Sequence, residues 1–231
     1  MTVTTSKSAY ALGLQDGFPF IIAVIPFAVL FGVVATEAGL DLLQVLSFSV
    51  VVIAGAAQFT ALQLMIEEAP TLIILVTALA VNLRMAMYSA SLTPYLGDAP
   101  LLTRAFVSYF LVDQSYACSI VRFEENPEWS TATRVSYFFG AITLVCPMWY
   151  VMTVVGALIG TSLPEWLALD FAVPITFLAL IAPMLRTIPH LAAAVTSIVL
   201  ALVFAFLPYN LGLLIAAVSA MAIGAELERR T

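Results

Sequence analysis

The segment PTLIILVTALAVNLRMAMYSASLTP (residues 70–94) combines an apolar run of membrane-spanning length with a charged side chain inside it. An α-helix needs about 20 residues to cross ~30 Å of hydrocarbon, and this segment reaches that length. Arg84 falls within it, where an unpaired guanidinium is costly. The segment therefore predicts a membrane helix and raises the question of what pairs with Arg84.

The composition of the chain predicts an all-α integral membrane protein. Of its 231 residues, 63% are hydrophobic and 10% are charged, and the mean hydropathy is +1.09. Soluble domains carry about 25% charged residues, so lipid must cover most of the surface of this chain. We predict a single transmembrane domain (1–231), built as a polytopic bundle of about eight helices, some of them kinked or broken. The expected location is the cytoplasmic membrane.

Charged and metal-binding residues exclude several classes of function. The net charge of -6 argues against nucleic-acid binding, which needs basic patches. Two cysteines and one histidine supply no spaced ligand set, so we expect no metal and no other cofactor. Hydrolysis inside a membrane needs a nucleophile with a base, paired carboxylates or a metal. Asp113 is the sole mid-span carboxylate, so we do not expect an enzyme.

Apolar runs predict eight spans, with seven as the alternative if residues 171–207 form one span and a re-entrant piece. Placing both termini in the cytoplasm puts most Lys and Arg residues at cytoplasmic ends, as the positive-inside rule requires. Arg104 is the exception in this arrangement, because it falls on the outside. The predicted spans are 18–36, 42–66, 71–95, 101–121, 135–161, 171–186, 190–207 and 209–225.

Four proline and glycine residues mark predicted helix breaks or gating positions. Pro19 and Pro26 lie in the first span, where proline removes a backbone donor and kinks a helix. Gly32 in the same span, and Gly55 in IAGAAQF (53–59), permit close helix approach or local unwinding. Ordinary helix packing is the alternative explanation of all four.

The hydropathy outline hints at an internal repeat. PFAVLFGVVATEAGLDLLQVL (26–46) and WYVMTVVGALIGTSLPEWLAL (149–169) share an aromatic start, small residues with glycine, and a turn before an acidic residue and leucines. Many transporters are built from such halves. The halves would cover about 13–96 and 134–225, and the sequence leaves open whether they are parallel or inverted.

Polar side chains at membrane depth form the predicted substrate site. Arg84 and Tyr88 lie on one helical stripe, and Asp113 lies at a similar depth in the next predicted span, so the two charges are expected to pair. Such a cluster suits a small zwitterion, with Asp113 binding the ammonium and Arg84, or backbone donors of a broken helix, binding the carboxylate. A stabilising pair without a ligand is the alternative. The predicted site consists of Gln58, Asn82, Arg84, Tyr88, Asp113 and Gln114.

Four ordered segments carry a family resemblance. GFPFIIAVIPFAVLFG (17–32), AGAAQF (54–59), VNLRMAMYSASLTPYL (81–96) and LVDQSYA (111–117) resemble the AzlC family, the large subunit of branched-chain amino acid exporters. The resemblance implies a permease that exports valine, leucine, isoleucine and sometimes methionine together with a small AzlD-type membrane subunit. It also implies that the family's motif residues are Gln58, Asn82, Arg84, Asp113, Pro26 and Gly32.

Two positions depart from the family pattern. Members commonly have a histidine where this chain has Met85, and often an acidic residue where it has Gln114. Both changes remove a titratable group, so proton coupling would have to use Asp113 or another carboxylate, or be absent. The competing function is a channel or structural membrane-assembly subunit, in which Arg84 and Asp113 form a stabilising pair and bind no substrate.

Overall fold

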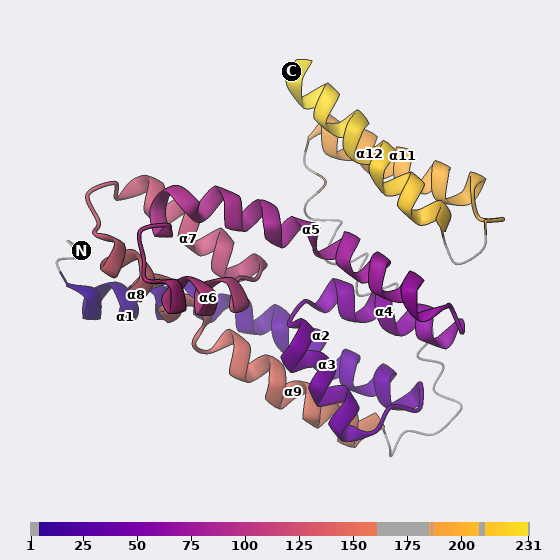
Figure 1. Cartoon of the computed structure of the whole chain (residues 1–231), viewed down its shortest axis with the longest axis horizontal. Helices are drawn as coiled ribbons and strands as arrows, with labels where there is room; N and C mark the ends of the chain where they lie inside the picture. The colour runs from indigo at the N-terminus through magenta and orange to yellow at the C-terminus, as the bar shows by residue number, and fades with distance from the viewer. Residues whose placement is uncertain (1–4, 161–184, 186, 208–210, 231) are drawn as a thin grey trace. The chain divides into compact units, whose positions relative to one another are not determined.

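The computed structural model describes residues 5–160, 185, 187–207 and 211–230, and these described residues are helical with no strand among them (Figure 1). The predicted all-α fold is confirmed. The chain forms two compact units, of which unit 1 comprises residues 1–63 with 78–165 and unit 2 comprises 64–77 with 166–231. The predicted span 171–186 lies outside the described residues except for Leu185.

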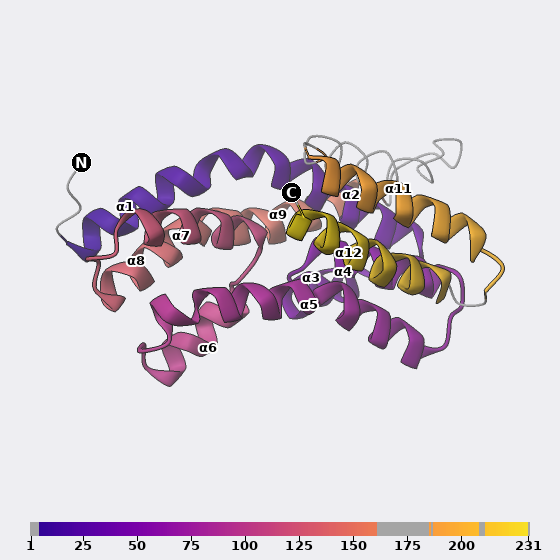
Figure 2. The ribbon, with the colours of Figure 1, turned by 90° about the horizontal axis from the view of Figure 1, so that it is seen from above.

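Unit 1 is built on two long helical runs that lie side by side (Figure 2). The Tyr10 and Thr143 hydroxyls lie 2.8 Å apart, and the Thr36 hydroxyl donates to the Ala157 carbonyl at 3.4 Å. Because these contacts advance along both runs together, the runs are parallel. The first run consists of α1 (Ser6–Gly17), the 3-10 turn η1 (Phe18–Phe20) and α2 (Ile21–Glu37), and the second of α8 (Thr131–Ile142) and α9 (Val145–Gly160).

Glycines allow the two runs to touch backbone to backbone. A Cβ at Gly32 would lie 2.2 Å from the Thr153 carbonyl oxygen, and one at Gly140 would lie 2.1 Å from that of Tyr10. Any larger residue at either position would force the helices apart. The first halves of the two predicted repeats thus contain parallel runs, and residues 161–184 of the second predicted half lie outside the described residues.

The predicted break positions in the first span have different structural roles. Pro19 lies in the 3-10 turn that joins α1 to α2, so the helix changes its winding there. Helix α2 continues through both Pro26 and Gly32. Gly32 is therefore a helix-packing position, and neither residue breaks the helix.

The predicted span 42–66 is instead a helical hairpin, here called the first hairpin. Ile53 has a left-handed φ of 42°, which reverses the chain at the small residues that follow. The Gln58 amide then donates to the Ser49 hydroxyl at 3.0 Å across the turn. The helices have 11 and 12 residues, or roughly 16–18 Å at ~1.5 Å per residue, so neither crosses a bilayer alone. They are α3 (Leu42–Val52) and α4 (Gly55–Ile66).

The predicted span 101–121 is also a hairpin, here called the second hairpin. Val112 is extended and its N–H donates to the Ser115 hydroxyl at 3.0 Å, which caps a new helix start. The prediction of one continuous span over residues 101–121 is therefore wrong. Asp113 begins a new helix at the break and does not lie partway along that span. The hairpin consists of α6 (Leu101–Tyr109) and α7 (Asp113–Glu125).

Helix α7 lies along α5 (Thr71–Leu96) and runs in the same direction. Arg84 of α5 meets Asp113, and further along both helices the ring centroids of Tyr95 and Phe123 lie 5.6 Å apart. A continuous crossing after α5 would run in the opposite direction. Helix α6 must therefore carry the chain back before α7 begins.

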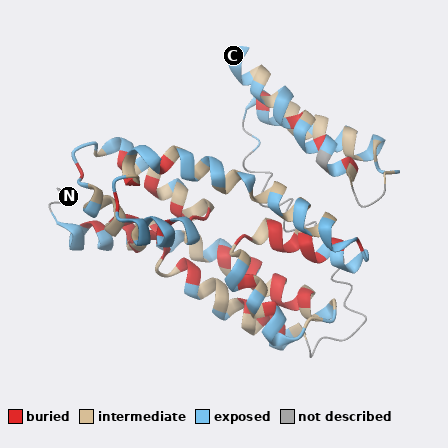
Figure 3. Cartoon of the chain, in the orientation of Figure 1, coloured by how far each residue is buried: buried red, intermediate tan, exposed pale blue. Residues whose placement is uncertain are grey.

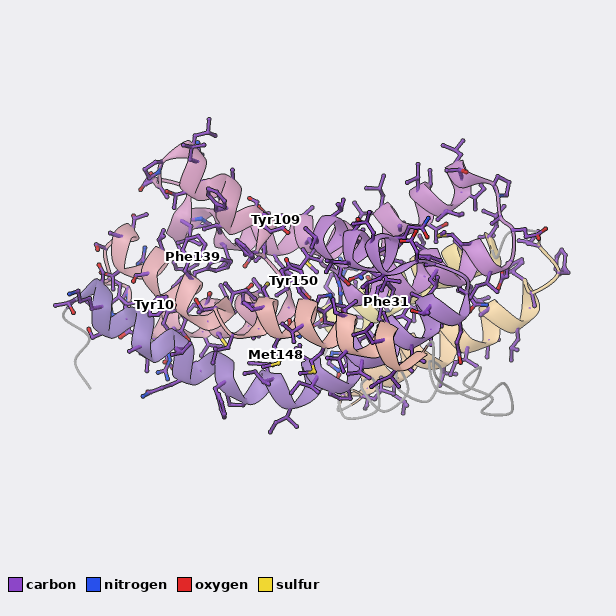
Figure 4. The ribbon with its side chains drawn as sticks, turned by 90° about the horizontal axis from the view of Figure 1, so that it is seen from below. Tyr10, Phe31, Tyr109, Phe139, Met148 and Tyr150 are labelled. Carbon is purple, nitrogen blue, oxygen red and sulfur yellow. The ribbon has the colours of Figure 1, made fainter. Side chains whose placement is uncertain are left out.

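The tips of the two hairpins meet halfway along the parallel runs. The first tip is residues 53–54 and the second is residues 110–112. The Tyr109 hydroxyl donates to the Val50 carbonyl at 2.7 Å and lies 3.1 Å from the Tyr150 hydroxyl (Figure 4). Ile53 and Phe110 both pack against one buried cluster made of Val24, Val112, Ile142, Val145 and Cys146.

The hairpins enter unit 1 from opposite ends. Helix α3 follows directly from the end of α2, whereas the far end of α7 lies by α1, where Arg122 Nε donates to Asp16 at 2.8 Å. The end of α5 lies there too, because the Arg134 guanidinium of α8 sits 5.3 Å from the centre of the Tyr95 ring. Helix α5 thus runs against the two long runs, contrary to the prediction, because the first hairpin turns back.

This direction changes the distribution of charge. Helix α6 starts where α5 ends, so Arg104 lies at the same end of unit 1 as Lys7, Arg122 and Arg134. Within unit 1, Arg104 thus does not fall at the end opposite to the other three basic residues, as the prediction had placed it. Two of the predicted crossings in unit 1 are replaced by hairpins, so the count of eight spans is revised downward there.

Unit 2 contains an antiparallel pair, α11 (Ile188–Val203) and α12 (Leu211–Arg230). A Cβ at Gly212 would meet Phe204, and one at Gly224 would meet Ala193, so α12 packs on α11 through its glycines. Four helical segments among the described residues are long and apolar enough to cross a membrane. These are Ser6–Glu37, Thr71–Leu96, Thr131–Gly160 and Leu211–Arg230.

Candidate functional site

A charged cluster joins α5 to the start of α7, as the sequence predicted. Arg84 Nη1 lies 3.0 Å from Asp113 Oδ2, and the Tyr88 hydroxyl donates to Asp113 Oδ1 at 3.0 Å. Asp113 is the first residue of α7, where the helix dipole favours a negative charge. The carboxylate therefore has three stabilising partners within its own chain.

The predicted polar stripe of α5 continues along the same contact. The Tyr88 and Tyr116 rings stack with centroids 4.1 Å apart and planes 10° apart. One turn further, the Ser91 hydroxyl lies 3.1 Å from the Tyr116 hydroxyl. The stripe thus holds the second hairpin against α5. Gln114 is half-buried beside Asp113.

Gln58 is not part of this cluster, contrary to the prediction. It is fully buried where the first hairpin packs on α9, and α4 is one of the most buried helices of unit 1 (Figure 3). Its amide nitrogen donates to Ser49, whose hydroxyl lies 3.2 Å from that of Thr153. Gln58 Oε1 has no hydrogen-bond partner among the described residues.

Ser49 and Thr153 were missed by sequence reasoning. Single hydroxyls in apolar runs are common in membrane helices, since they can bond to their own backbone. The turn of the first hairpin brings Ser49 to Gln58, and the packing of the hairpin against α9 brings Thr153 to Ser49. No sequence pattern would have identified these two hydroxyls.

A cavity of about 210 Å³ lies between the two hairpin tips and the middle of α5. Asn82 lines it, and the Asn82 Oδ1 atom is buried without a hydrogen-bond partner among the described residues. Met85, at one of the two positions where the sequence departs from the expected family pattern, also lines it. The other lining residues are 51–54 at the first tip and Ser108, Tyr109 and Leu111 at the second.

The structure therefore divides the predicted site. Arg84, Tyr88 and Asp113 form one cluster, whereas Asn82 is one of the residues that line the cavity and Gln58 is enclosed in packing. Gly55, a predicted break position, is the first residue of α4 and directly follows the first tip. In the described part of the chain, no group of three or more His, Cys, Asp or Glu residues is placed to hold a metal ion.

Comparisons with known proteins agree with this core. The model of the AzlC protein family matches residues 19–163, which include both hairpins and the Arg84–Asp113 pair. The inner membrane protein YgaZ of Escherichia coli (strain K12) is 26% identical over 180 residues, which are 75% of this chain and 72% of YgaZ. An uncharacterized membrane protein of Archaeoglobus fulgidus is 30% identical over 205 residues, 86% of each chain. No solved structure matches the chain.

Proposed function

Because this chain belongs to the AzlC family of membrane proteins, we propose that it is a secondary transporter that exports branched-chain and other hydrophobic amino acids from the cytoplasm. Family membership and the inner-membrane relative support a role in membrane transport. Valine, leucine, isoleucine and methionine are the proposed substrates, on the family resemblance.

The meeting of two broken helices around a cavity carries this proposal. Irregular backbone is tolerated at membrane depth only where it is buried in protein or lines a cavity. Broken helices around a central site are a recurrent design of secondary transporters. The cavity of about 210 Å³ is below the ~300–1,000 Å³ of drug-sized sites, and this size suits a small metabolite.

The proposed orientation places the N-terminus in the cytoplasm. Lys7, Arg104, Arg122 and Arg134 gather at the end of unit 1 that contains the start of α1. Positive residues favour the cytoplasmic side. We further propose a small AzlD-type subunit as partner, on the basis of the family resemblance, and two cytoplasmic termini.

A second candidate function is a channel or structural subunit. The observation that favours it is the internal pairing of Asp113, which takes both Arg84 and Tyr88 as partners. Such a pair needs no ligand to be stable.

Reconstitution with the small subunit separates these functions. Vesicles preloaded with unlabelled valine should take up labelled valine transiently and against its gradient, because a carrier exchanges its substrates. We expect saturable counterflow that the empty vesicles lack. Uptake that rises linearly with valine concentration, with no counterflow, would favour the channel. The absence of any valine flux would contradict the proposed export.

A further inference from the structure

We infer that the cavity between the hairpin tips binds the zwitterionic amino acid, with its carboxylate at the start of α4 and its ammonium at Asn82. This inference rests on the proposed transport function and deepens it. It moves the substrate away from the Arg84–Asp113 pair, since neither residue lines the cavity.

The start of α4 provides donors for a carboxylate. The first backbone bond of the helix runs from the Gln58 N–H to the Ala54 carbonyl at 3.0 Å, and Ala54 lines the cavity. The N–H groups of residues 55–57 therefore lie outside the helical ladder. The positive end of the helix dipole adds to their attraction for an anion. The first turn of α4 contains no acidic side chain.

Asn82 and the end of α3, which also line the cavity, provide acceptors for an ammonium. Asn82 Oδ1 is a buried acceptor without a partner among the described residues, and such an atom loses free energy until a donor reaches it. Helix α3 ends at Val52, so carbonyls of its last turn lie at the same tip. One of them, that of Val50, already accepts from Tyr109. An ammonium has three donors, and these can be shared between Asn82 and the remaining carbonyls.

The rest of the lining is apolar. Val51, Val52, Met85 and Leu111 face the cavity, so a hydrophobic side chain gains by leaving water there. The unbranched thioether of Met85 adapts to different shapes, which suits a site that accepts leucine, isoleucine and methionine alike. A charged substrate side chain would find no charged partner in this lining.

A ligand series tests the two ends of the site. The purified chain with its small subunit would be titrated with L-leucine, with leucinamide, which lacks the carboxylate, and with 4-methylpentanoate, which lacks the ammonium. We expect the wild type to bind leucine best. Asn82→Leu should weaken leucine binding roughly tenfold to a hundredfold, the size of a lost hydrogen bond to a charged group, but change 4-methylpentanoate binding little.

The matched control removes an amide elsewhere. Gln15 is an exposed amide on α1 and does not line the cavity, so Gln15→Leu should leave the affinities for all three ligands unchanged. If Asn82→Leu weakened leucine and 4-methylpentanoate equally, the ammonium would not bind Asn82, and this assignment would be overturned.

Cysteine protection gives a second readout that needs no Asn82 variant. With Cys118→Ser and Cys146→Ala replacing both free cysteines, single cysteines would be placed at Val52 and Leu111. Saturating leucine should slow their reaction with a small thiol reagent. A cysteine at Leu83, on the exposed face of α5, should react at the same rate with and without leucine.

The outcomes separate this inference from the proposed function. If leucine binds the wild type but protects neither cavity cysteine, the substrate lies elsewhere and the inference is wrong, while transport stands. If the wild type binds no hydrophobic amino acid at all, the proposed function itself is wrong.

Discussion

The first hairpin (α3 and α4) and the second hairpin (α6 and α7) both turn back halfway along unit 1. They differ in the charge at the first turn of the helix that follows the turn. Helix α7 begins with Asp113, whose carboxylate is bound by Arg84 and Tyr88. Helix α4 begins with Gly55 and two alanines and has no acidic residue in its first turn. One positive helix end is thus neutralised within the chain, whereas the other is left for a ligand.

The comparison also separates two uses of polar residues in membranes. The second hairpin is attached to α5 by a charged pair whose side chains are 35% and 42% exposed. The first hairpin is attached to α9 by uncharged, fully buried groups, Gln58, Ser49 and Thr153. A half-exposed pair can rearrange when water or substrate reaches it, whereas an enclosed amide cannot move without breaking the packing.

The largest effect is expected when the neutralised helix start is disrupted. Asp113→Asn should reduce counterflow by more than about tenfold, because it leaves the Arg84 guanidinium unpaired at membrane depth. The expected loss of stability is about 1–3 kcal/mol, discounted for the exposure of the pair. Thermal denaturation of the purified protein and counterflow measure the two effects.

Arg84→Gln with Asp113→Asn is the matched control, since it removes both charges together. We expect it to recover most of the stability and none of the transport. Normal counterflow in the single and double variants would show that the pair has only a structural role.

The next effect comes from making the first hairpin resemble the second. Ala56→Asp places a carboxylate in the first turn of α4, where the helix dipole offsets about 0.3–1 kcal/mol of the cost of a charge at membrane depth. The protein should fold, but leucine affinity should fall by roughly tenfold or more, because the carboxylate competes with that of the substrate. Isothermal titration measures the affinity.

Ala56→Asn is the control for size at this position. It has a similar volume and no negative charge, so its affinity should remain close to that of the wild type. Equal losses in both variants would indicate crowding of the cavity and contradict the proposed anion site.

A smaller effect is expected at the contact between the tips. Tyr109→Phe removes the hydroxyl that donates to Val50 and lies by Tyr150, so stability should fall by about 0.5–1.5 kcal/mol. The ring keeps its packing against Phe110, so the fold should persist. Tyr150→Phe keeps the bond to Val50 and should cost less. Equal costs would show that the Tyr109–Tyr150 contact dominates.

The smallest effect is expected at Gln58. Its Oε1 atom is already without a partner among the described residues, so Gln58→Leu loses one hydrogen bond and removes one buried unsatisfied atom. The two changes oppose each other, and stability should change by less than about 1 kcal/mol. Counterflow should remain above half that of the wild type. If Gln58→Leu folded normally but did not transport, Gln58 would belong to the substrate site after all.

Sequence reasoning predicted the ion pair but not its geometry. A guanidinium and a carboxylate in neighbouring apolar runs are both costly to bury unless they pair, so Arg84 and Asp113 were predictable partners. The course of the polypeptide chain between the two residues was not predictable. The hydropathy of residues 101–121 predicts one crossing because the residues at the break, 110–112, are themselves apolar. They interrupt the helix but not the hydrophobic run.

The same limit explains the missed cavity. Asn82 was predicted as a site residue because an amide at membrane depth is costly. The residues that line the cavity with it include 51–54 at the first tip and Leu111 at the second, and such apolar residues do not stand out in a hydrophobic sequence.

The sequence by itself determined that the chain is helical, that lipid surrounds it, and which polar side chains have to find partners, since each follows from the cost of exposing polar groups to hydrocarbon. Tertiary structure alone decided that two apolar runs turn back as hairpins and that their tips meet. It also decided that Asn82 lines the cavity while Gln58 is enclosed in the packing of the first hairpin. The physical reason is that a hairpin and a crossing bury the same apolar residues, so only the contacts between helices distinguish them.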